Sequence, residues 1–395
     1  MRVTNKVKWV LPIIVISQFC CTSLWFAGNG VMNDLVNSFQ LNATALGYLT
    51  SSVQLGFIAG TLIFALLTIA DRYSPSKVFF VCAIIGSLFN LGVIIENNTV
   101  FSLLSFRFLT GFFLAGIYPV GMKIAADYYQ KGLGKSLGFL VGALVIGTAF
   151  PHLLKGLTIG FPWRVVIIFT SCLACLGGLL MLLFVPNGPY RKSNQKFDFS
   201  AWLKVFKIKK FRSAAFGYFG HMWELYAFWA FVPVILKNYS VTHPNVTFNI
   251  PILSFIIIGV GGIACVIGGY LSQLFGAKKI ATTALLLSCI CCLISPFLLS
   301  INYSPALIIF LIFWGMVVIA DSPLFSTLVA QNALPESKGT ALTIVNCIGF
   351  SITILSIQLI NILNVSWNPK YVYIILAIGA ILGLIALSKK ERKKL

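Results

Sequence analysis

Residues 252–266 read ILSFIIIGVGGIACV, a stretch with no charged side chain and no alternation of apolar and polar positions. It lies inside an uncharged run, residues 250–272, which as a helix can cross a bilayer core about 30 Å thick. A strand of a membrane β-barrel would instead alternate in polarity over roughly ten residues. The stretch therefore predicts a transmembrane α-helix.

Eleven further apolar runs are separated by short polar connectors. Hydrophobic residues make up 58% of the 395 residues, charged residues 10%, and the mean hydropathy is +0.94. A water-soluble protein could not divide this composition between a core and a surface. The sequence therefore predicts an all-α membrane protein of twelve transmembrane helices with no soluble domain. The predicted spans are residues 8–29, 45–69, 78–95, 100–124, 136–158, 163–186, 213–236, 250–272, 280–300, 305–330, 339–364 and 371–388.

The longest interior connector, Pro186–Arg212, contains Pro-Asn-Gly-Pro followed by eight Lys and Arg residues, and it separates six spans from six. We expect two six-helix bundles, residues 1–186 and 213–395, joined by a basic linker, residues 187–212. Within the linker, the apolar spacing of Phe199–Phe211 predicts a short amphipathic helix on the inner membrane surface.

About 24 of the 29 Lys and Arg residues fall on one side of the predicted spans. This asymmetry places that side, with both termini, in the cytoplasm. The formal net charge of +20 is then juxtamembrane, which favours contact with anionic lipid headgroups over nucleic-acid binding. The compact chain favours a bacterial inner membrane.

The connectors after the second span of each half resemble one another. Residues 67–77 read LTIADRYSPSK, and residues 269–279 read GYLSQLFGAKK. In the major facilitator superfamily, the corresponding loop reads Gly-x-Leu-Ala-Asp-Arg-x-Gly-Arg-Lys. The first copy departs from that pattern at Leu67, Ser74 and Ser76. The residues that carry the resemblance, and that we expect to form the gating loops, are Asp71, Arg72, Lys77, Gly269, Gly276 and Lys278.

The fourth span carries a second feature of that superfamily, Arg107 followed by Gly111, Gly116 and Gly121. The resemblance implies two rigid bundles that rock about a central site, with Asp71 pairing with Arg72 or a facing cation to stabilise the outward-open form. The chain also resembles, more loosely, the anion-porter branches that include nitrate and cyanate transporters.

Few ionisable residues lie deep inside the predicted spans, where the cost of burying a charge makes each a candidate for function. Counting about 1.5 Å per residue, His221, Glu224 and Asp321 fall near the midplane. His221 and Glu224 are three residues apart and so share a helix face. A carboxylate at this depth can serve proton coupling. The alternatives are an interhelical hydrogen bond for His221 and Glu224, and stabilisation of a kink beside Pro323 for Asp321.

Arg107 and His152 lie about 10 Å below the outer face, at depths that permit contact. A buried guanidinium fits carboxylate, nitrate or phosphate, which favours an anionic solute. The alternative is that Arg107 clamps its bundle through backbone carbonyls. Lys123, at the inner end of its span, is expected as an interfacial anchor.

Aromatic and amide side chains occupy the first span of each half: Trp25 and Asn29, then Trp223 and Tyr226. In the superfamily that the chain resembles, these helices line the central cavity, so the four residues are candidate solute contacts. The alternative is packing or lipid contact.

The sequence thus predicts a proton-driven secondary transporter that moves a small anion by alternating access, with an efflux antiporter for amphipathic or cationic compounds as the alternative. A membrane enzyme acting on lipid phosphates would need a carboxylate pair, a His-rich motif or a phosphate-cradling loop, and the nine acidic residues are scattered. Cys289, Cys291 and Cys292 lack the spacing of metal ligands. We expect no enzyme activity, no cofactor and no metal. The expected partners are a small-molecule solute, protons and the lipid bilayer, and the expected oligomeric state is a monomer.

Overall fold

The computed structural model describes residues 3–42, 44–129, 133–191, 204–334 and 338–388, and every regular element in these ranges is a helix. Eleven helical segments there are long and apolar enough to cross a membrane, and α1 adds the shorter apolar stretch Trp9–Thr22. The predicted all-α membrane fold is therefore confirmed.

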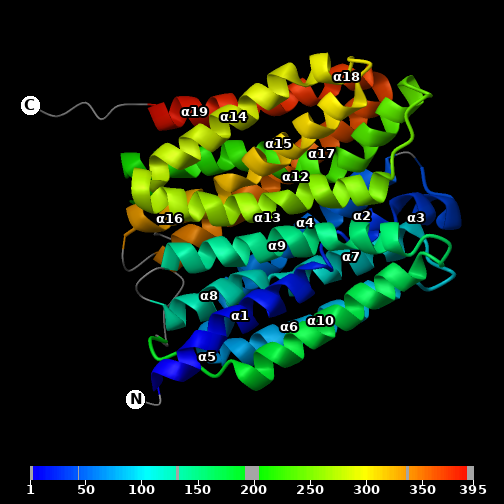
Figure 1. The fold of residues 1–395 in the computed structure, drawn as a ribbon. Helices are drawn as coiled ribbons and strands as arrows, with labels where there is room; N and C mark the ends of the chain where they lie inside the picture. Colours follow the sequence, from blue (N-terminus) through cyan, green and yellow to red (C-terminus); the bar gives the residue numbers. More distant parts are fainter. Residues whose placement is uncertain (1–2, 43, 130–132, 192–203, 335–337, 389–395) are drawn as a thin grey trace, which may run out of the picture.

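Two helical bundles lie side by side (Figure 1). The first contains α1 (Val3–Thr22), α4 (Ala45–Leu66), α6 (Pro75–Gly92), α7 (Val100–Leu114), α8 (Tyr118–Tyr128), α9 (Leu133–Leu157) and α10 (Arg164–Phe184). The second contains α12 (Lys209–Thr242), α13 (Ile250–Phe275), α14 (Ala277–Leu298), α15 (Ser304–Ala320), α16 (Ser322–Asn332), α17 (Lys338–Ser366) and α19 (Ala377–Ser388). The short helices are α2 (Ala27–Gly30), α3 (Met32–Phe39), α5 (Ile69–Arg72), α18 (Pro369–Val372) and the 3-10 helix η2 (Tyr373–Leu376).

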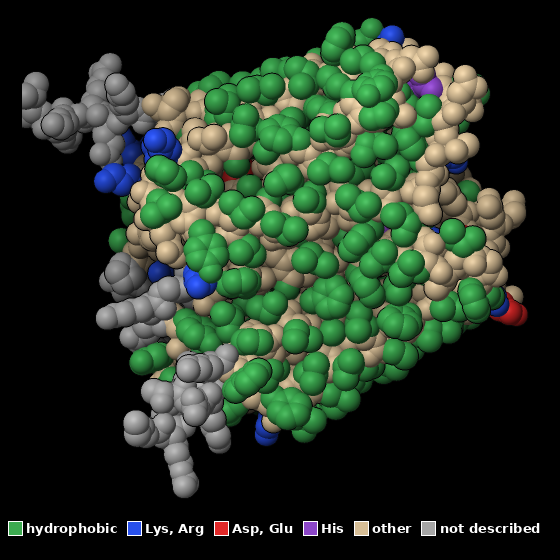
Figure 2. Space-filling model, viewed as in Figure 1, with side chains coloured by type: hydrophobic (Ala, Val, Ile, Leu, Met, Phe, Trp, Pro, Cys, Tyr) green, Lys and Arg blue, Asp and Glu red, His purple; other side chains and the backbone are tan. Residues whose placement is uncertain are grey.

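The helices run between two ends of the molecule. At one end, left in Figure 1, α1 begins and α19 ends, and we call it the termini end; α2, α3 and α18 lie at the opposite, far end. Hydrophobic side chains cover the face between the two ends in Figure 2, and many are large and exposed, such as Leu88, Leu183 and Ile309. Lipid rather than water suits such a surface.

Three predicted spans are broken rather than continuous. Span 8–29 ends as a helix at Thr22 and resumes at Ala27, span 100–124 breaks between α7 and α8, and span 305–330 breaks at Asp321. Pro119 and Pro323 stand at the second positions of α8 and α16, where a missing amide does no harm, but they cannot continue the preceding helix.

The linker boundary also differs from its prediction, because α12 begins at Lys209 rather than after Arg212. Of the predicted surface helix over 199–211, residues 199–203 lie outside the described residues. Residues 209–211 belong to α12.

Glycines bring α4 and α7 into backbone contact. A Cβ on Gly56 would collide with the Phe108 carbonyl, and a Cβ on Gly111 would collide with the Val53 carbonyl. Small residues of this kind let membrane helices pack closely. Helix α13 of the second half packs on α9 of the first half in the same way. A Cβ on Gly142 would lie 2.9 Å from the Gly262 carbonyl oxygen, and a Cβ on Gly262 would lie 2.9 Å from the Gly142 carbonyl oxygen.

We expect Gly111→Ala to destabilise the protein by about 1–3 kcal/mol, because the added methyl has only backbone to displace. Thermal unfolding in detergent, followed by size-exclusion chromatography, measures the change. Gly259→Ala is the matched control, since its nearest neighbour is the Phe255 ring at 3.5 Å, an ordinary contact distance. Equal melting temperatures for the two variants would contradict the close packing.

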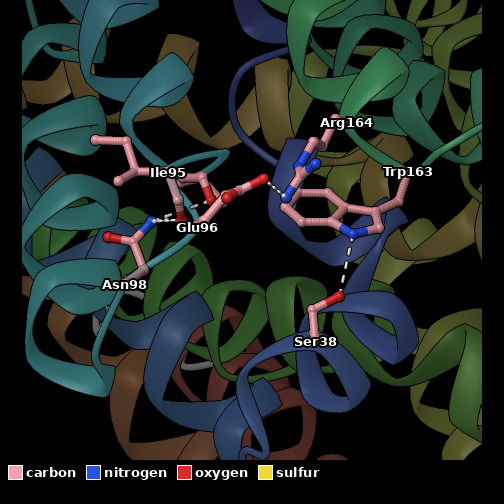
Figure 3. A network of polar contacts seen from close by, with 7 residues as sticks. Ser38, Ile95, Glu96, Asn98, Trp163 and Arg164 are labelled. Atoms are coloured by element: carbon pink, nitrogen blue, oxygen red, sulfur yellow. Dashed lines mark hydrogen bonds and ion pairs between the residues drawn. The ribbon is translucent and has the colours of Figure 1, made fainter.

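The loops at the far end of the first bundle are tied together by polar contacts (Figure 3). Trp163 Nε1 donates to Ser38 Oγ at 3.2 Å, and Arg164 lies 3.3 Å from the Glu96 carboxylate. The Asn98 amide donates to the carbonyls that end α6, including Gly92 O at 2.9 Å. These contacts fix the entry of α7 and α10 into the bundle.

Candidate functional site

A cavity of about 350 Å³ lies between the two bundles. Its lining includes Asp71 of α5, Lys123 of α8 and Gly339 at the start of α17. Because α5 and α8 lie toward the termini end in Figure 1, we place the mouth of the cavity at that end. Its inner end reaches Tyr226 and Phe350. The cavity therefore connects the middle of the molecule with one end.

The cavity wall combines aromatic rings with neutral hydrogen-bonding groups. The only charged side chains among its described lining residues are Asp71 and Lys123, at the mouth. The rings are those of Phe64, Tyr118, Tyr218, Tyr226 and Phe350, and the neutral polar groups are those of Thr61, Thr68, Ser322, Ser326, Thr340, Thr343 and Asn346. Such a wall fits a solute with an apolar body and neutral polar groups.

Six aromatic rings, contributed by both bundles, close the inner end of the cavity. We call them the aromatic floor: Trp25, Phe26, Phe57, Tyr226, Trp229 and Phe350. Trp25 stacks on Tyr226 with ring centroids 5.7 Å apart, and Phe57 lies 4.5 Å from Phe350. The structure thus brings together Trp25 and Tyr226, two residues that the sequence placed on equivalent helices.

Beyond the floor, the bundles are bound to one another at the far end. Asn361 of α17 donates to Thr44 O of the first bundle at 3.0 Å, and Gln358 Nε2 donates to Ser51 Oγ at 2.8 Å. A Cβ on Gly47 would overlap the Asn361 side chain. The cavity is therefore open at the termini end and closed at the far end.

A buried carboxylate and imidazole pair lies directly behind the cavity wall. His221 Nδ1 is 2.8 Å from Asp321 Oδ1, and both side chains are 1% exposed. The neighbours of the pair along the chain, Tyr218, Ile319 and Ser322, line the cavity. His221 Nε2 and Asp321 Oδ2 have no hydrogen-bond partner in the part of the chain that the structure describes.

Asp321 owes its position to the break between α15 and α16. The proline at position 323 ends the α15 ladder, and the Asp321 carbonyl accepts from the amides of Leu324 and Phe325 to begin α16. The helix break and the acidic side chain therefore occur at the same residue. The sequence alone left open whether Asp321 serves proton coupling or stabilises the kink.

Glu224 does not share the surroundings of His221, although the two stand three residues apart. Its Oε1 accepts from Ser288 Oγ of α14 and from Trp314 Nε1 of α15, the latter at 2.6 Å. Glu224 of α12 is therefore hydrogen-bonded to two other helices of the second bundle. These contacts are of the kind expected under the alternative given above, in which Glu224 makes an interhelical hydrogen bond.

Arg107 is a fully buried clamp in the first bundle. Its guanidinium donates to Leu24 O at 3.2 and 3.3 Å, to Trp25 O, and to Asn90 Oδ1 at 3.2 Å. Leu24 and Trp25 belong to the break after α1, where helix carbonyls lose their usual donors. The contacts are those of the alternative in which Arg107 binds backbone carbonyls.

The remaining candidate residues are dispersed. His152 is 3% exposed, and its Nε2 has no hydrogen-bond partner among the described residues. Asn29 donates to Thr50 Oγ1 at 2.9 Å within the first bundle. Trp223 donates to Ile375 O at 3.1 Å and packs on Gly379, so it contacts η2 and α19 rather than lining the cavity.

The gating loops surround the mouth at the termini end. Asp71 pairs with Lys123 at 2.8 Å, a cation that the sequence favoured as a membrane anchor, while Arg72 donates to Thr68 Oγ1. Arg191 donates to the carbonyls of Asp71 and Tyr73. In the second copy, Gly276 ends α13 at φ +87°, a conformation that suits glycine, whereas Lys77 and Lys278 are exposed and Gly269 is buried.

We expect the single variants Asp71→Lys and Lys123→Asp to reduce the transport that the sequence predicts. The double exchange should restore part of it, because the swap rebuilds an ion pair at the mouth. A partly exposed pair contributes about 0.2–1 kcal/mol, so the transport rate of each single variant should fall by up to roughly fivefold. Initial transport rates in vesicles measure the effect. Strictly additive losses would contradict a direct pairing.

The comparisons with known proteins identify the fold. The family model of the Major Facilitator Superfamily matches residues 14–357. No curated protein sequence matches closely enough to narrow this result. The structure is similar to that of the human organic anion transporter MFSD10 (TETRAN), with 12% sequence identity, a TM-score of 0.75, and coverage of 97% of this chain and 99% of that chain.

Two further structures have the same fold. A bacterial homologue of the human lysosomal transporter Spinster, inward-facing and unoccupied, has 16% identity, a TM-score of 0.69, and coverage of 97% of this chain and 95% of its own. A mutant of the nucleoside transporter NupG has 16% identity, a TM-score of 0.72, and coverage of 97% and 100%. At these identities the likeness shows the fold alone, and the nitrate and cyanate branch stays a prediction.

Proposed function

The chain belongs to the Major Facilitator Superfamily, and from that premise we propose that it is a proton-coupled secondary transporter seen with its central cavity open at the termini end. The observation that carries the proposal is the His221–Asp321 pair, buried directly behind the wall of a cavity that both bundles line. Alternating access would close this mouth and open the far end.

The pair can couple a proton to that movement. When the imidazole and the carboxylate share one proton, the pair is neutral overall. Loss of that proton leaves a net negative charge in surroundings that solvate charge poorly. A rearrangement that admits water to one side can therefore load or release the proton. Asp321 sits at a helix break, where a shift of α16 relative to α15 would change its surroundings.

The solute that this cavity supports best is amphipathic. The expectation of an anion depended on Arg107 and His152, yet Arg107 is occupied by backbone carbonyls and neither residue lines the cavity. The aromatic and hydroxyl wall supports the alternative of an amphipathic compound. We propose further that the termini end faces the cytoplasm, that the membrane is a bacterial inner membrane, and that the transporter works as a monomer.

Proteoliposomes loaded with a pH-sensitive dye test the proposal. Nitrate represents anions, tetraphenylphosphonium represents lipophilic cations, and methyl benzoate represents neutral amphipathic solutes. We expect proton flux with an amphipathic probe and none in protein-free liposomes. Flux with nitrate alone would favour the anion, and no flux with any class, from protein shown to be folded, would contradict proton-coupled transport.

A further inference from the structure

The aromatic floor and the half of the interbundle path beyond it contain buried polar atoms without partners. They belong to side chains no more than 3% exposed. Within the described residues, no hydrogen bond is made by Trp25 Nε1, Gln54 Nε2 and Oε1, Thr148 Oγ1, His152 Nε2 or Trp229 Nε1. Buried polar groups in proteins are almost always paired, so this concentration calls for a function.

On α4, Gln54 lies on the face that meets the second bundle. Gly47 and Ser51, about two turns and one turn nearer the far end, contact Asn361 and Gln358 of α17, and Thr61 on the other side lines the cavity. Positions 47, 51, 54 and 61 fall on one side of a helix. Gln54 is therefore placed between the open cavity and the closed far end.

On α9, Thr148 and His152 continue from the cavity toward the far end. Leu144 lines the cavity, Thr148 and His152 follow at successive turns, and Gly156 packs on Ile252 of α13. The two tryptophans flank the same path. The ring centroid of Tyr226, which lines the cavity, lies 5.7 Å from that of Trp25 and 5.3 Å from that of Trp229. The five side chains thus come from both bundles and follow one route.

We propose that Trp25, Gln54, Thr148, His152 and Trp229 form the solute-binding surface of the far-end-open state, and that the solute presents hydrogen-bond acceptor oxygens to it. The indole N–H groups can only donate, and the other three side chains can donate as well. When the far end opens, these groups gain access to the solute and to water. The inference rests on the proposed transport function and adds the location and chemistry of a second face of its site.

Cysteine labelling from each side of sealed vesicles tests the location. Gln54→Cys and Thr148→Cys are treated with a membrane-impermeant maleimide, with the parent chain and its ten native cysteines as the baseline. We expect both variants to react above that baseline from the far side. Failure of both to react from that side, or reaction from the termini side alone, would overturn the inference.

Two control variants calibrate the result. Thr170→Cys replaces a buried residue of α10 that donates to Val166 O within the first bundle, and it should stay unlabelled. Thr343→Cys lines the open cavity and should react from the termini side. A protein that shows solute-driven proton flux but no far-side labelling contradicts this inference alone, whereas absence of flux contradicts the proposed function whatever the labelling.

The chemistry of the solute is tested with a matched pair of probes. We expect methyl benzoate to slow the labelling of Gln54→Cys and ethylbenzene, which lacks the acceptor oxygens, not to. Adding Trp229→Phe, which keeps a ring but removes the donor, should weaken methyl benzoate protection about tenfold, the effect of losing one hydrogen bond. Equal protection by the two probes, or none by methyl benzoate, would overturn the assignment of an acceptor-bearing solute.

Discussion

Asp321→Asn is expected to abolish solute accumulation driven by a proton gradient while leaving solute exchange intact. The amide keeps the size of the carboxylate and its place at the α15–α16 break, but it cannot take part in proton transfer with His221, 2.8 Å away. Because an amide cannot take up the proton, we expect the coupled rate to fall by at least about 100-fold, the size of effect that losing a positioned proton-transfer group has.

The measurement compares two assays on the same proteoliposomes, accumulation under an imposed pH gradient and counterflow without one. Asp34→Asn is the control, because Asp34 pairs with Lys155 at the far end and is partly exposed, so both assays should stay near the parent values. Undiminished accumulation by Asp321→Asn would contradict its coupling role. Loss of exchange as well would assign Asp321 to stabilising the helix break.

Arg107→Met is expected to lower stability by about 3–5 kcal/mol, because it leaves the carbonyls at the break after α1 without donors in a water-poor interior. A large protein loses roughly 2 °C of melting temperature for each kcal/mol of lost stability, so we expect the melting temperature to fall by roughly 5–10 °C. The break positions Trp25 and Phe26 in the aromatic floor, so transport should fall in parallel.

Thermal unfolding in detergent measures the change. Arg164→Met is the matched control, since Arg164 is half-exposed and its pairing with Glu96 spans 3.3 Å at the surface, so its removal should cost little. A melting temperature of Arg107→Met equal to that of Arg164→Met, with transport abolished, would contradict the clamp and return Arg107 to the transport pathway.

The fold could be predicted from the sequence because a lipid bilayer requires apolar segments of a set length whose backbone hydrogen bonds are all satisfied internally. Uncharged runs of spanning length, as in residues 250–272, can only be helices in lipid, and the long basic linker separates them six from six. The break at residues 22–27 was not predicted, since this segment carries no proline and the Leu24 carbonyl is bound by Arg107, 83 residues away. Pro323, by contrast, marked the kink at Asp321 in the sequence.

The candidate site was predicted only in part, for a related reason. Depth along a helix identified His221 and Asp321, but depth does not give the direction in which a side chain points. Glu224 turns to Ser288 and Trp314, and Trp223 turns to η2, because the register of α12 against its neighbours is set by packing. Tyr218 and Asn346 carry no sequence signal that distinguishes them from other helix residues.

The central claim is that the two bundles open alternately at the two ends, and paired distance measurements between spin labels test it most directly. One pair of labels replaces the exposed residues Tyr48 and Ile362, near the far ends of α4 and α17, and the other replaces Leu66 and Lys338, near the termini end. On lowering the pH in the presence of solute, we predict that the far-end distance lengthens while the termini-end distance shortens. Distances that stay fixed at both ends, or that lengthen together, would contradict alternating access in this protein.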